Sequence, residues 1–329
     1  MENKIKNTAL KYFTNDEIAA VAFNNGRAVI SLHNTQENKE LANKLKEELL
    51  TFENITKANV IFTATKSAPS LQDKPDLWKV KNVKKIYAVA SGKGGVGKST
   101  TSVNLALALA SLGKKVALFD ADIYGPSIPT MLGYENQPAI SLDGKTFEPF
   151  KAYNLESMSI GTLIDRDTPL IWRGSKACGA IEQLLTEVNW GKIDIMLLDM
   201  PPGTGDIQIT ISQRLNLDGA VIVSTPQDIA LIDAVKGVNM FAKVDVPILG
   251  IVENMSYYIC PKCGNRDDIF GHAGAKETAE RLGVKFLGEI PLNYTIRTHA
   301  DAGKPIVISE PESEYAKAYI EIAKKIIAD

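Results

Sequence analysis

The stretch Ser91-Gly-Lys-Gly-Gly-Val-Gly-Lys-Ser-Thr100 directly follows the apolar run Ile86-Tyr-Ala-Val-Ala90. A glycine, four residues, a second glycine, a lysine and a serine form the pattern of a phosphate-binding loop, which requires a strand before it and a helix after it. The apolar run predicts the strand, and apolar residues at helical spacing from Lys98 to about Leu112 predict the helix, with Gly113 as its stop. The sequence therefore predicts a nucleoside triphosphate site.

Each part of this loop has a chemical task. The glycines let the backbone curl so that its N–H groups point at phosphates, and the helix N-terminus adds its positive dipole end. The lysine at the end of the loop is expected to reach the β- and γ-phosphates, and the serine hydroxyl is expected to ligate Mg²⁺. The residues expected to bind nucleotide are Gly92, Lys93, Gly94, Gly95, Val96, Gly97, Lys98, Ser99 and Thr100.

Composition limits the classes of protein to consider. The chain has 329 residues, of which 45% are hydrophobic and 23% charged, which fits one large and one small globular domain. A net charge of -2 provides no general attraction to nucleic acid or to an anionic membrane. No apolar run approaches the roughly 18 residues of a membrane span, and the polar N-terminus has no apolar signal core. We therefore expect a cytoplasmic protein without a nucleic-acid or membrane partner.

The chain divides by pattern into a small domain, a linker and a large domain. Residues 1–66 read as a small α+β domain, in which Asn24-Asn-Gly26 signals a hairpin and His33 is expected at a strand end or on the surface. Residues 67–81 have the composition of a linker. Residues 82–329 alternate strand and helix, which predicts an α/β domain whose mostly parallel sheet is flanked by helices.

Two segments of the large domain carry more specific expectations. Residues 140–150 contain Asp143-Gly144 and are expected to form a hairpin outside the main sheet. The final helix, from about Ser313 to Ala328, has an apolar stripe but no strongly basic face. It is therefore expected to pack on the sheet rather than to lie on a membrane.

Acidic residues stand where two predicted strands end. Asp120 and Asp122 follow one apolar strand, and Asp199 ends another, and ligands of open α/β sheets bind at such carboxyl ends. Asp199 is expected to be the metal-side carboxylate of the phosphate-loop site. One of the first two acids has an alternative role as the cap of a helix that begins near Pro126. The Pro-Pro-Gly-Thr-Gly stretch after Asp199 suits a phosphate-sensing switch, and Asp206 is a candidate helix N-cap.

The turn Cys260-Pro-Lys-Cys263 is typical of a metal site, because its spacing aims two thiolates at one metal. Tetrahedral sites need about four ligands and this chain offers one pair, so a two-fold dimer is expected to supply the rest. A redox disulfide and a structural zinc shared between subunits are the alternatives. Cys178 is expected to be a small buried helix residue, and His272 is a possible ligand without a second signal.

The motifs together resemble the Mrp/ApbC family of iron-sulfur cluster carrier ATPases over residues 82–329. They occur in the family's order: the loop at residues 91–100, Asp-Ala-Asp-Ile-Tyr-Gly-Pro-Ser127, Trp172-Arg-Gly174, Asp-Met-Pro-Pro-Gly-Thr-Gly-Asp206, Glu-Asn-Met-Ser256 and Cys-Pro-Lys-Cys-Gly264. The resemblance implies a homodimer that binds a labile 4Fe-4S cluster between its subunits. It also implies slow ATP hydrolysis, delivery of the cluster to apo iron-sulfur proteins, and a cluster assembly scaffold as partner.

Residue by residue, the resemblance implies the roles at the nucleotide. The loop has the deviant form of the MinD and ParA class of ATPases, in which Lys93 reaches across the dimer interface to the partner's nucleotide. Lys93, Lys98 and Asp122 would be the catalytic residues, with Asp122 orienting the attacking water. Asn254 is a candidate for reading the adenine.

The resemblance also implies the metal ligands. Ser99, Asp120 and Asp199 would hold Mg²⁺, in part through water molecules. Cys260 and Cys263 would ligate the cluster.

The chain departs from the family pattern in two places. Ser175 and Lys176 follow Trp172-Arg-Gly174 where the family usually has Pro-Met, and residues 1–66 are short and lack an acidic, glycine-containing signature. Two other functions remain open at this point. One is a MinD/ParA-type positioning ATPase on membrane or DNA, and the other is an ATPase whose dimer is bridged by zinc and whose cargo is different.

Overall fold

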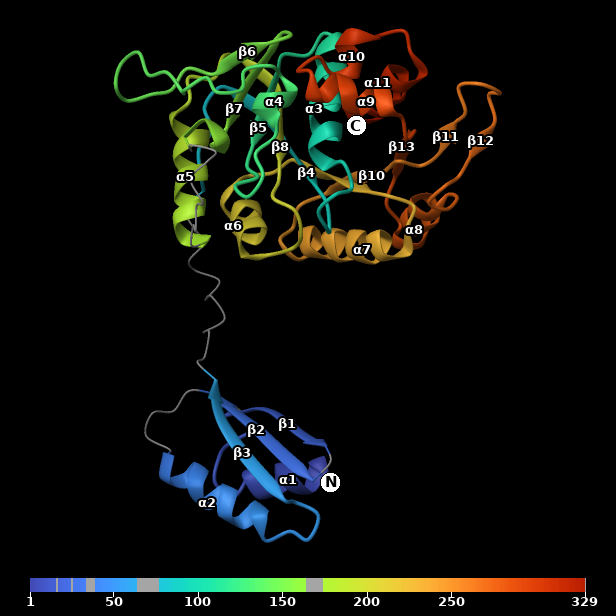
Figure 1. Ribbon diagram of the computed structural model, residues 1–329. Coiled ribbons are helices and arrows are strands. Elements are labelled where there is room, and N and C mark those ends of the chain that lie inside the picture. The colour runs from blue at the N-terminus through green and yellow to red at the C-terminus, as the bar shows by residue number, and fades with distance from the viewer. Residues whose placement is uncertain (16, 25, 34–38, 64–76, 164–173, 329) are drawn as a thin grey trace. The chain divides into compact units, whose positions relative to one another are not determined.

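The computed structural model describes residues 1–15, 17–24, 26–33, 39–63, 77–163 and 174–328 (Figure 1). The chain forms two compact units, Met1–Lys74 and Pro75–Asp329. Trp78, which falls in the predicted linker, is buried in the second unit, and its backbone N–H donates to the carbonyl of Arg214. The part of the predicted linker around Trp78 therefore packs against the core of the large unit.

The first unit is a three-stranded sheet with two helices packed against it. Strand β1 runs antiparallel to β2 and β2 parallel to β3, and Gly26, with φ of 75°, closes the predicted β1–β2 hairpin. The core gathers Ile5 and Leu45 from the helices against Ile30 and Leu32 of β2. A first helix was not predicted, and His33 is the last residue of β2. The elements are α1 (Glu2–Ala9), β1 (Ile18–Asn24), β2 (Arg27–His33), α2 (Lys39–Leu50) and β3 (Lys57–Thr63).

The second unit is built on an eight-stranded sheet in the order β13-β10-β9-β4-β8-β5-β7-β6, which is parallel except for β6. This confirms the predicted fold class. The strands are β4 (Val83–Ala90), β5 (Val116–Asp120), β6 (Phe150–Ala152), β7 (Leu155–Ser159), β8 (Ile193–Asp199), β9 (Gly219–Ser224), β10 (Ile248–Asn254) and β13 (Phe286–Ile290).

The predicted hairpin at residues 140–150 is wrong. The hairpin of this region is β6–β7, it belongs to the main sheet, and Tyr153 and Asn154 turn it with φ of 50° and 63°. The Asp143-Gly144 signal marks a local turn instead. The Asp143 carboxylate accepts hydrogen bonds from the backbone N–H groups of Lys145 and Thr146, which satisfies the turn without a partner strand.

Helices cover both faces of the sheet, as Figure 1 shows. Along β4, Tyr87 and Val89 face the core cluster shared with α3 and α11, whereas Ala88 and Ala90 face the cluster shared with α5 to α8. This alternation is the period of a strand buried on both sides. The helices are α3 (Lys98–Ser111), α4 (Ile128–Met131), the 3-10 helix η1 (Ile160–Leu163), α5 (Gly174–Glu187), α6 (Asp206–Arg214), α7 (Asp228–Lys243), α8 (Gly274–Leu282), α9 (Tyr294–Asp301), α10 (Ile306–Ser309) and α11 (Glu314–Ile327).

The C-terminal helix α11 packs as predicted. Tyr319, Ile322 and Ile326 are buried in the cluster that also holds α3, and Ser313 caps the helix by accepting a hydrogen bond from the N–H of Ala316. Within the residues that the structure describes, no helix is long and apolar enough to cross a membrane.

Candidate active site and cysteine hairpin

The sheet order places the predicted loop and acids side by side. Strands β4, β8 and β5 are neighbours, and all three run parallel. The loop leaves the end of β4, Asp199 ends β8, and Asp120 ends β5 in direct register with Asp199. The residues predicted from separate motifs therefore meet at one edge of the sheet, the carboxyl edge where α/β proteins bind ligands.

The loop backbone has the conformation that its glycines allow. Gly95 and Gly97 have φ of 82° and 80°, a region that residues with a Cβ rarely adopt. A Cβ on Gly94 would meet nothing within 4 Å, so the middle of the loop borders open space. At Gly92 a Cβ would lie 2.1 Å from the carbonyl oxygen of Asp233, so the start of the loop presses directly on α7.

Asn254, at the end of β10, supports the loop from below. Its side-chain amide donates to the carbonyl of Val96 at 2.8 Å, and a Cβ on Gly97 would lie 2.1 Å from the same amide nitrogen. The side-chain amide of Asn254 thus stabilises the loop through this hydrogen bond. A contact between this residue and adenine stays a prediction.

Lys98 is the centre of a buried ionic cluster. Its side chain is 5% exposed, and its Nζ lies 2.8 Å from Oδ2 of Asp199 and 3.8 Å from Oδ2 of Asp122. The hydroxyl of Ser99 donates to the same Asp199 oxygen at 2.6 Å and lies 3.2 Å from Lys98 Nζ. The two residues predicted for phosphate and Mg²⁺ are thus held by the acid predicted for the metal side.

Asp120 has a structural role that the sequence left as an alternative. One of its oxygens accepts from the N–H of Ile128, the first residue of α4, and from the hydroxyl of Ser159. The other accepts from the N–H of Asp122. Burial, together with the charge of Asp199, raises the pKa of Asp120 to about 7, although Lys98 opposes the rise. Asp120 therefore caps a helix; its role toward Mg²⁺ stays a prediction.

Asp122 is the third acid near Lys98, and its side chain is slightly exposed. Burial raises the pKa of its carboxyl group above the usual range, and its Oδ1 has no hydrogen-bond partner among the described residues. Among the described residues, Asp120, Asp122 and Asp199 gather around one cation, Lys98, so their negative charge favours the binding of a positive ion.

The donors fit Mg²⁺. Hard oxygen ligands from a hydroxyl and one or two carboxylates, completed by phosphates and water, are how proteins hold this ion. In the described part of the chain, no three His, Cys, Asp or Glu side chains converge to hold a metal by themselves. Nucleotide and water would supply the remaining ligands.

The residues that flank the cluster are also placed. Lys93 is partly exposed and forms no ion pair with any described residue; Thr100 lies in the first turn of α3.

Behind the loop, the N–H of Gly203 donates to the carbonyl of Ser91, which joins the predicted switch to the phosphate loop. The N-cap of α6 is Gly205, so the prediction that Asp206 caps this helix is wrong; it is an exposed acid in the first turn.

The two predicted metal-binding cysteines lie on a small hairpin of their own. Strands β11 (Tyr258–Ile259) and β12 (Arg266–Asp267) pair antiparallel, and the intervening turn carries Cys260, half-buried, and Cys263, exposed. The backbone N–H of Cys263, that of Lys262 and the thiol of Cys263 donate to the Cys260 sulfur, which lowers the pKa of Cys260. This turn stabilises a thiolate, the form that binds metals.

Arg266 fixes this hairpin to the rest of the unit. Its guanidinium lies 3.9 Å from the centre of the Tyr257 ring and forms ion pairs with Asp268 at 3.0 Å and Glu289 of β13 at 3.2 Å. Because Tyr257 precedes β11 and Arg266 begins β12, one side chain ties both ends of the hairpin to the sheet edge.

The other predicted ligands are not assembled with the cysteines. His272 is exposed and its Nδ1 lies 2.7 Å from Asp268, and no third His, Cys, Asp or Glu joins the cysteine pair among the described residues. Cys178, in α5, is partly buried against the core, which raises the pKa of its thiol. Trp172 and Arg173 lie outside the described residues, and Lys176 is exposed in α5.

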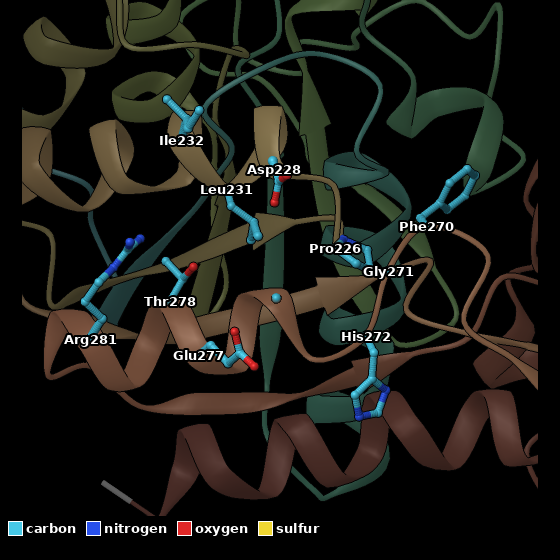
Figure 2. Close-up of a pocket in the computed structure, with 11 residues that line it drawn as sticks. Pro226, Asp228, Leu231, Ile232, Phe270, Gly271, His272, Glu277, Thr278 and Arg281 are labelled. Carbon is cyan, nitrogen blue, oxygen red and sulfur yellow. The ribbon is translucent and has the colours of Figure 1, made fainter.

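A groove of about 660 Å³ lies between α7 and α8, just beyond the cysteine hairpin (Figure 2). Leu231, Ile232 and Phe270 give it an apolar side, and Glu277 and Arg281 of α8 a charged one. None of the residues predicted for the nucleotide or for Mg²⁺ lines it, nor does either cysteine of the hairpin, whereas His272 does. The groove is therefore not the predicted nucleotide site.

Two serines of the site were not predicted. The hydroxyl of Ser102, in α3, donates to Oδ1 of Asp199 at 2.6 Å, and that of Ser159, at the end of β7, donates to Asp120 at 3.0 Å. Both partners are distant in sequence, so only the strand order could have indicated these contacts.

Comparison with known proteins identifies the family. A family model described as the NUBPL iron-transfer P-loop NTPase matches residues 82–327. The chain belongs to this family. The match covers the second unit almost entirely, and it confirms the resemblance that the motifs predicted.

Relatives of this chain include bacterial and eukaryotic proteins. The iron-sulfur cluster carrier protein of Haemophilus influenzae is 54% identical over 75% of this chain and 67% of its own length. The iron-sulfur cluster carrier protein of Escherichia coli is 54% identical over 76% and 68%. The iron-sulfur cluster transfer protein NUBPL of Mus musculus is 50% identical over 75% and 78%.

Solved structures show the same fold. The nucleotide-binding protein of Archaeoglobus fulgidus in complex with ADP is 37% identical, with a TM-score of 0.64 over 73% of this chain and 93% of that one. The cell division ATPase MinD of Pyrococcus furiosus is 27% identical, with a TM-score of 0.58 over 74% and 98%. The chain is thus a P-loop NTPase of the MinD type.

Proposed function

We propose that this protein is a cytoplasmic, ATP-dependent iron-sulfur cluster carrier. Two copies hold one 4Fe-4S cluster between them and deliver it to apo-proteins after a scaffold has loaded it. The observation that carries the proposal is the Cys260–Cys263 turn, which presents a stabilised thiolate and an exposed thiol at the surface of an NTPase unit. The relatives named as cluster carriers support the same cargo.

The cargo requires a second copy because one turn supplies half of the ligands. A cluster of this kind is held by about four cysteine thiolates, and a two-fold axis through the turn brings two pairs together. Lys93, free of ion pairs within the described chain, is available to the partner's nucleotide. Helix α7 presents Ile229 and Ile232, which are 70% and 58% exposed, and such residues suit a surface that a second copy covers.

The nucleotide chemistry follows from the buried cluster. Lys98 and the loop N–H groups would hold the phosphates, and Ser99 and Asp199 would hold Mg²⁺, with Asp120 beside them. Bound Mg²⁺ neutralises charge on the phosphate oxygens. Asp122, whose Oδ1 has no hydrogen-bond partner within the described part of the chain, would orient the attacking water. Asn254 and the loop glycines fix the backbone around them. Slow hydrolysis would convert ATP to ADP and phosphate, and release of both products would return the site to its free state.

Nucleotide and cluster are coupled through one dimer equilibrium. The loop presses on α7 at Gly92 and Asp233, and the groove beside α7 is walled by Phe270, a few residues beyond Cys263. A change in the loop on ATP binding would therefore shift α7, and with it the surface that also carries the cysteines. ATP would favour one arrangement of the two copies, and hydrolysis would release it.

Transfer of a cluster to an apo-acceptor tests the proposal. With Lys98→Ala, ATP should no longer change the rate of transfer, whereas the exposed Lys114→Ala should behave as the wild type. Transfer that is unchanged by Lys98→Ala, in protein that remains folded, would contradict the coupling. Pelleting with liposomes or DNA tests the positioning-ATPase alternative, and we expect no binding to either.

A further inference from the structure

Asp199 is fully buried, and side chains of α3 contact both of its oxygens. Lys98 and Ser99 contact Oδ2, and Ser102 alone among them contacts Oδ1, with a distance of 2.6 Å between its hydroxyl oxygen and the carboxylate. Ser102 lies one helical turn beyond Ser99, so both hydroxyls project from the same face of α3. Side chains of α3 therefore hold both oxygens of the Asp199 carboxylate.

Ser102 has a second acceptor within reach, and the distances decide between them. Its hydroxyl lies 3.1 Å from the carbonyl of Lys98, one turn back in the helix. A hydroxyl has a single proton to donate, and the shorter contact, to a charged oxygen, is the stronger one. The proton of Ser102 thus goes to Asp199.

We infer that Ser102 is a positioning residue that holds Asp199 in place while nucleotide and Mg²⁺ bind. The inference rests on the nucleotide site of the proposed function. There Lys98 would turn to phosphate and give up its contact with Oδ2, and the oxygen of Ser99 would ligate Mg²⁺ through a lone pair. The contact from Ser102 competes with neither ligand and keeps Oδ2 aimed at the metal position. Without the hydrogen bond from Ser102, the Asp199 carboxylate would have to be oriented anew each time nucleotide and Mg²⁺ bind.

The test separates Mg²⁺ binding from nucleotide binding. Calorimetry measures the affinity for ADP in EDTA and again in excess Mg²⁺, for wild type and for Ser102→Ala. In EDTA the two affinities should agree within about twofold, because the loop and Lys98 are intact. The gain in affinity that Mg²⁺ provides should fall about tenfold, the value of a charge-assisted hydrogen bond.

Three variants make the result specific. Ser102→Thr keeps the hydroxyl and should restore most of the gain, and Ser102→Cys fills the same space with a weak donor and should restore little. Ser212→Ala is the matched control, because Ser212 is also buried and donates to the carbonyl one turn back, that of Gln208, but its hydroxyl donates to no carboxylate of the described residues. It should leave the gain unchanged.

The inference is overturned if the Mg²⁺-dependent gain of Ser102→Ala stays within twofold of the wild type. If Ser102→Ala does not fold, the same comparison is made with Ser102→Cys, and an unchanged gain overturns the inference there too. Wild-type protein that binds no ADP would contradict the nucleotide site itself, and this role of Ser102 with it.

Discussion

At the scale of single residues, the active site concentrates charge that the free protein can only partly balance. Three carboxylates, Asp120, Asp122 and Asp199, meet one lysine in a buried place. Burial raises the pKa of both Asp120 and Asp122, so in the free protein these two carboxyl groups bind protons more readily than usual. A bound cation would favour their ionised forms instead.

The titration of Asp120 gives a prediction for the free protein. Its pKa in the fold, about 7, lies above the ordinary 3.8 expected for the unfolded chain. Between these values the folded state holds a proton that the unfolded chain releases, so the free energy of unfolding falls as pH rises through this range. Asp120→Asn removes the titration. Relative to the wild type, the free energy of unfolding of this variant should therefore be higher at pH 8 than at pH 5.

Chemical denaturation in EDTA without nucleotide checks this at both pH values. Asp206→Asn, which changes an exposed acid, controls for the loss of a charge. If Asp120→Asn differs from the wild type equally at pH 5 and pH 8, the raised pKa is not the cause.

At the scale of elements, the phosphate loop is held by α7 on one side and is open on the other. Gly92→Ala would place its Cβ against the backbone of Asp233, so the loop or α7 must move, and we expect a loss of about 1–3 kcal/mol in the free energy of unfolding. Gly94→Ala should change stability by less than about 0.5 kcal/mol. It should nevertheless weaken ADP binding, because the new methyl group projects into the open space beside the loop. Urea denaturation and ADP titration on the same two variants check both effects. Equal destabilisation by both would contradict this account.

The cysteine hairpin gives a second prediction at this scale. Arg266 is a surface residue whose ion pairs contribute little to stability, so Arg266→Ala should cost only about 1 kcal/mol. Its loss frees both ends of the hairpin, however, and after reconstitution a chelator should remove iron faster than from the wild type. Arg266→Lys should lie between the two, because lysine lacks the planar fork.

ADP affinity is the internal control, and Arg281→Ala is the matched variant on α8. Iron retention equal to the wild type, or an equal loss of ADP affinity, would show that Arg266 does not act on the hairpin.

Elements also show what the sequence could predict and why the rest was out of reach. The loop, its strand and its helix are local, so their pattern was sufficient, and the strand-end acids followed from the sheet being parallel. The Asp143-Gly144 turn misled because an aspartate side chain can satisfy a turn by itself, whereas the true hairpin turns at Tyr153 and Asn154 without glycine. Ser102 could not be predicted, because its contact with Asp199 exists only once β4 and β8 are paired.

At the scale of the whole molecule, the second unit is a complete NTPase fold with an incomplete metal site. Every residue predicted for nucleotide and Mg²⁺ lies at one sheet edge or in the loop beside it. The cysteine pair, in contrast, finds no third ligand among the described residues. From this contrast we propose that a second copy completes the cluster site.

Anaerobic reconstitution with iron and sulfide, followed by native mass and iron content, tests that claim most directly. We predict a species of two chains with about four irons, and a Cys260→Ala/Cys263→Ala control that binds no iron. A cluster on a single chain would contradict the claim. So would about one tightly held zinc per two chains that iron does not displace, since the cysteines would then be a structural clasp.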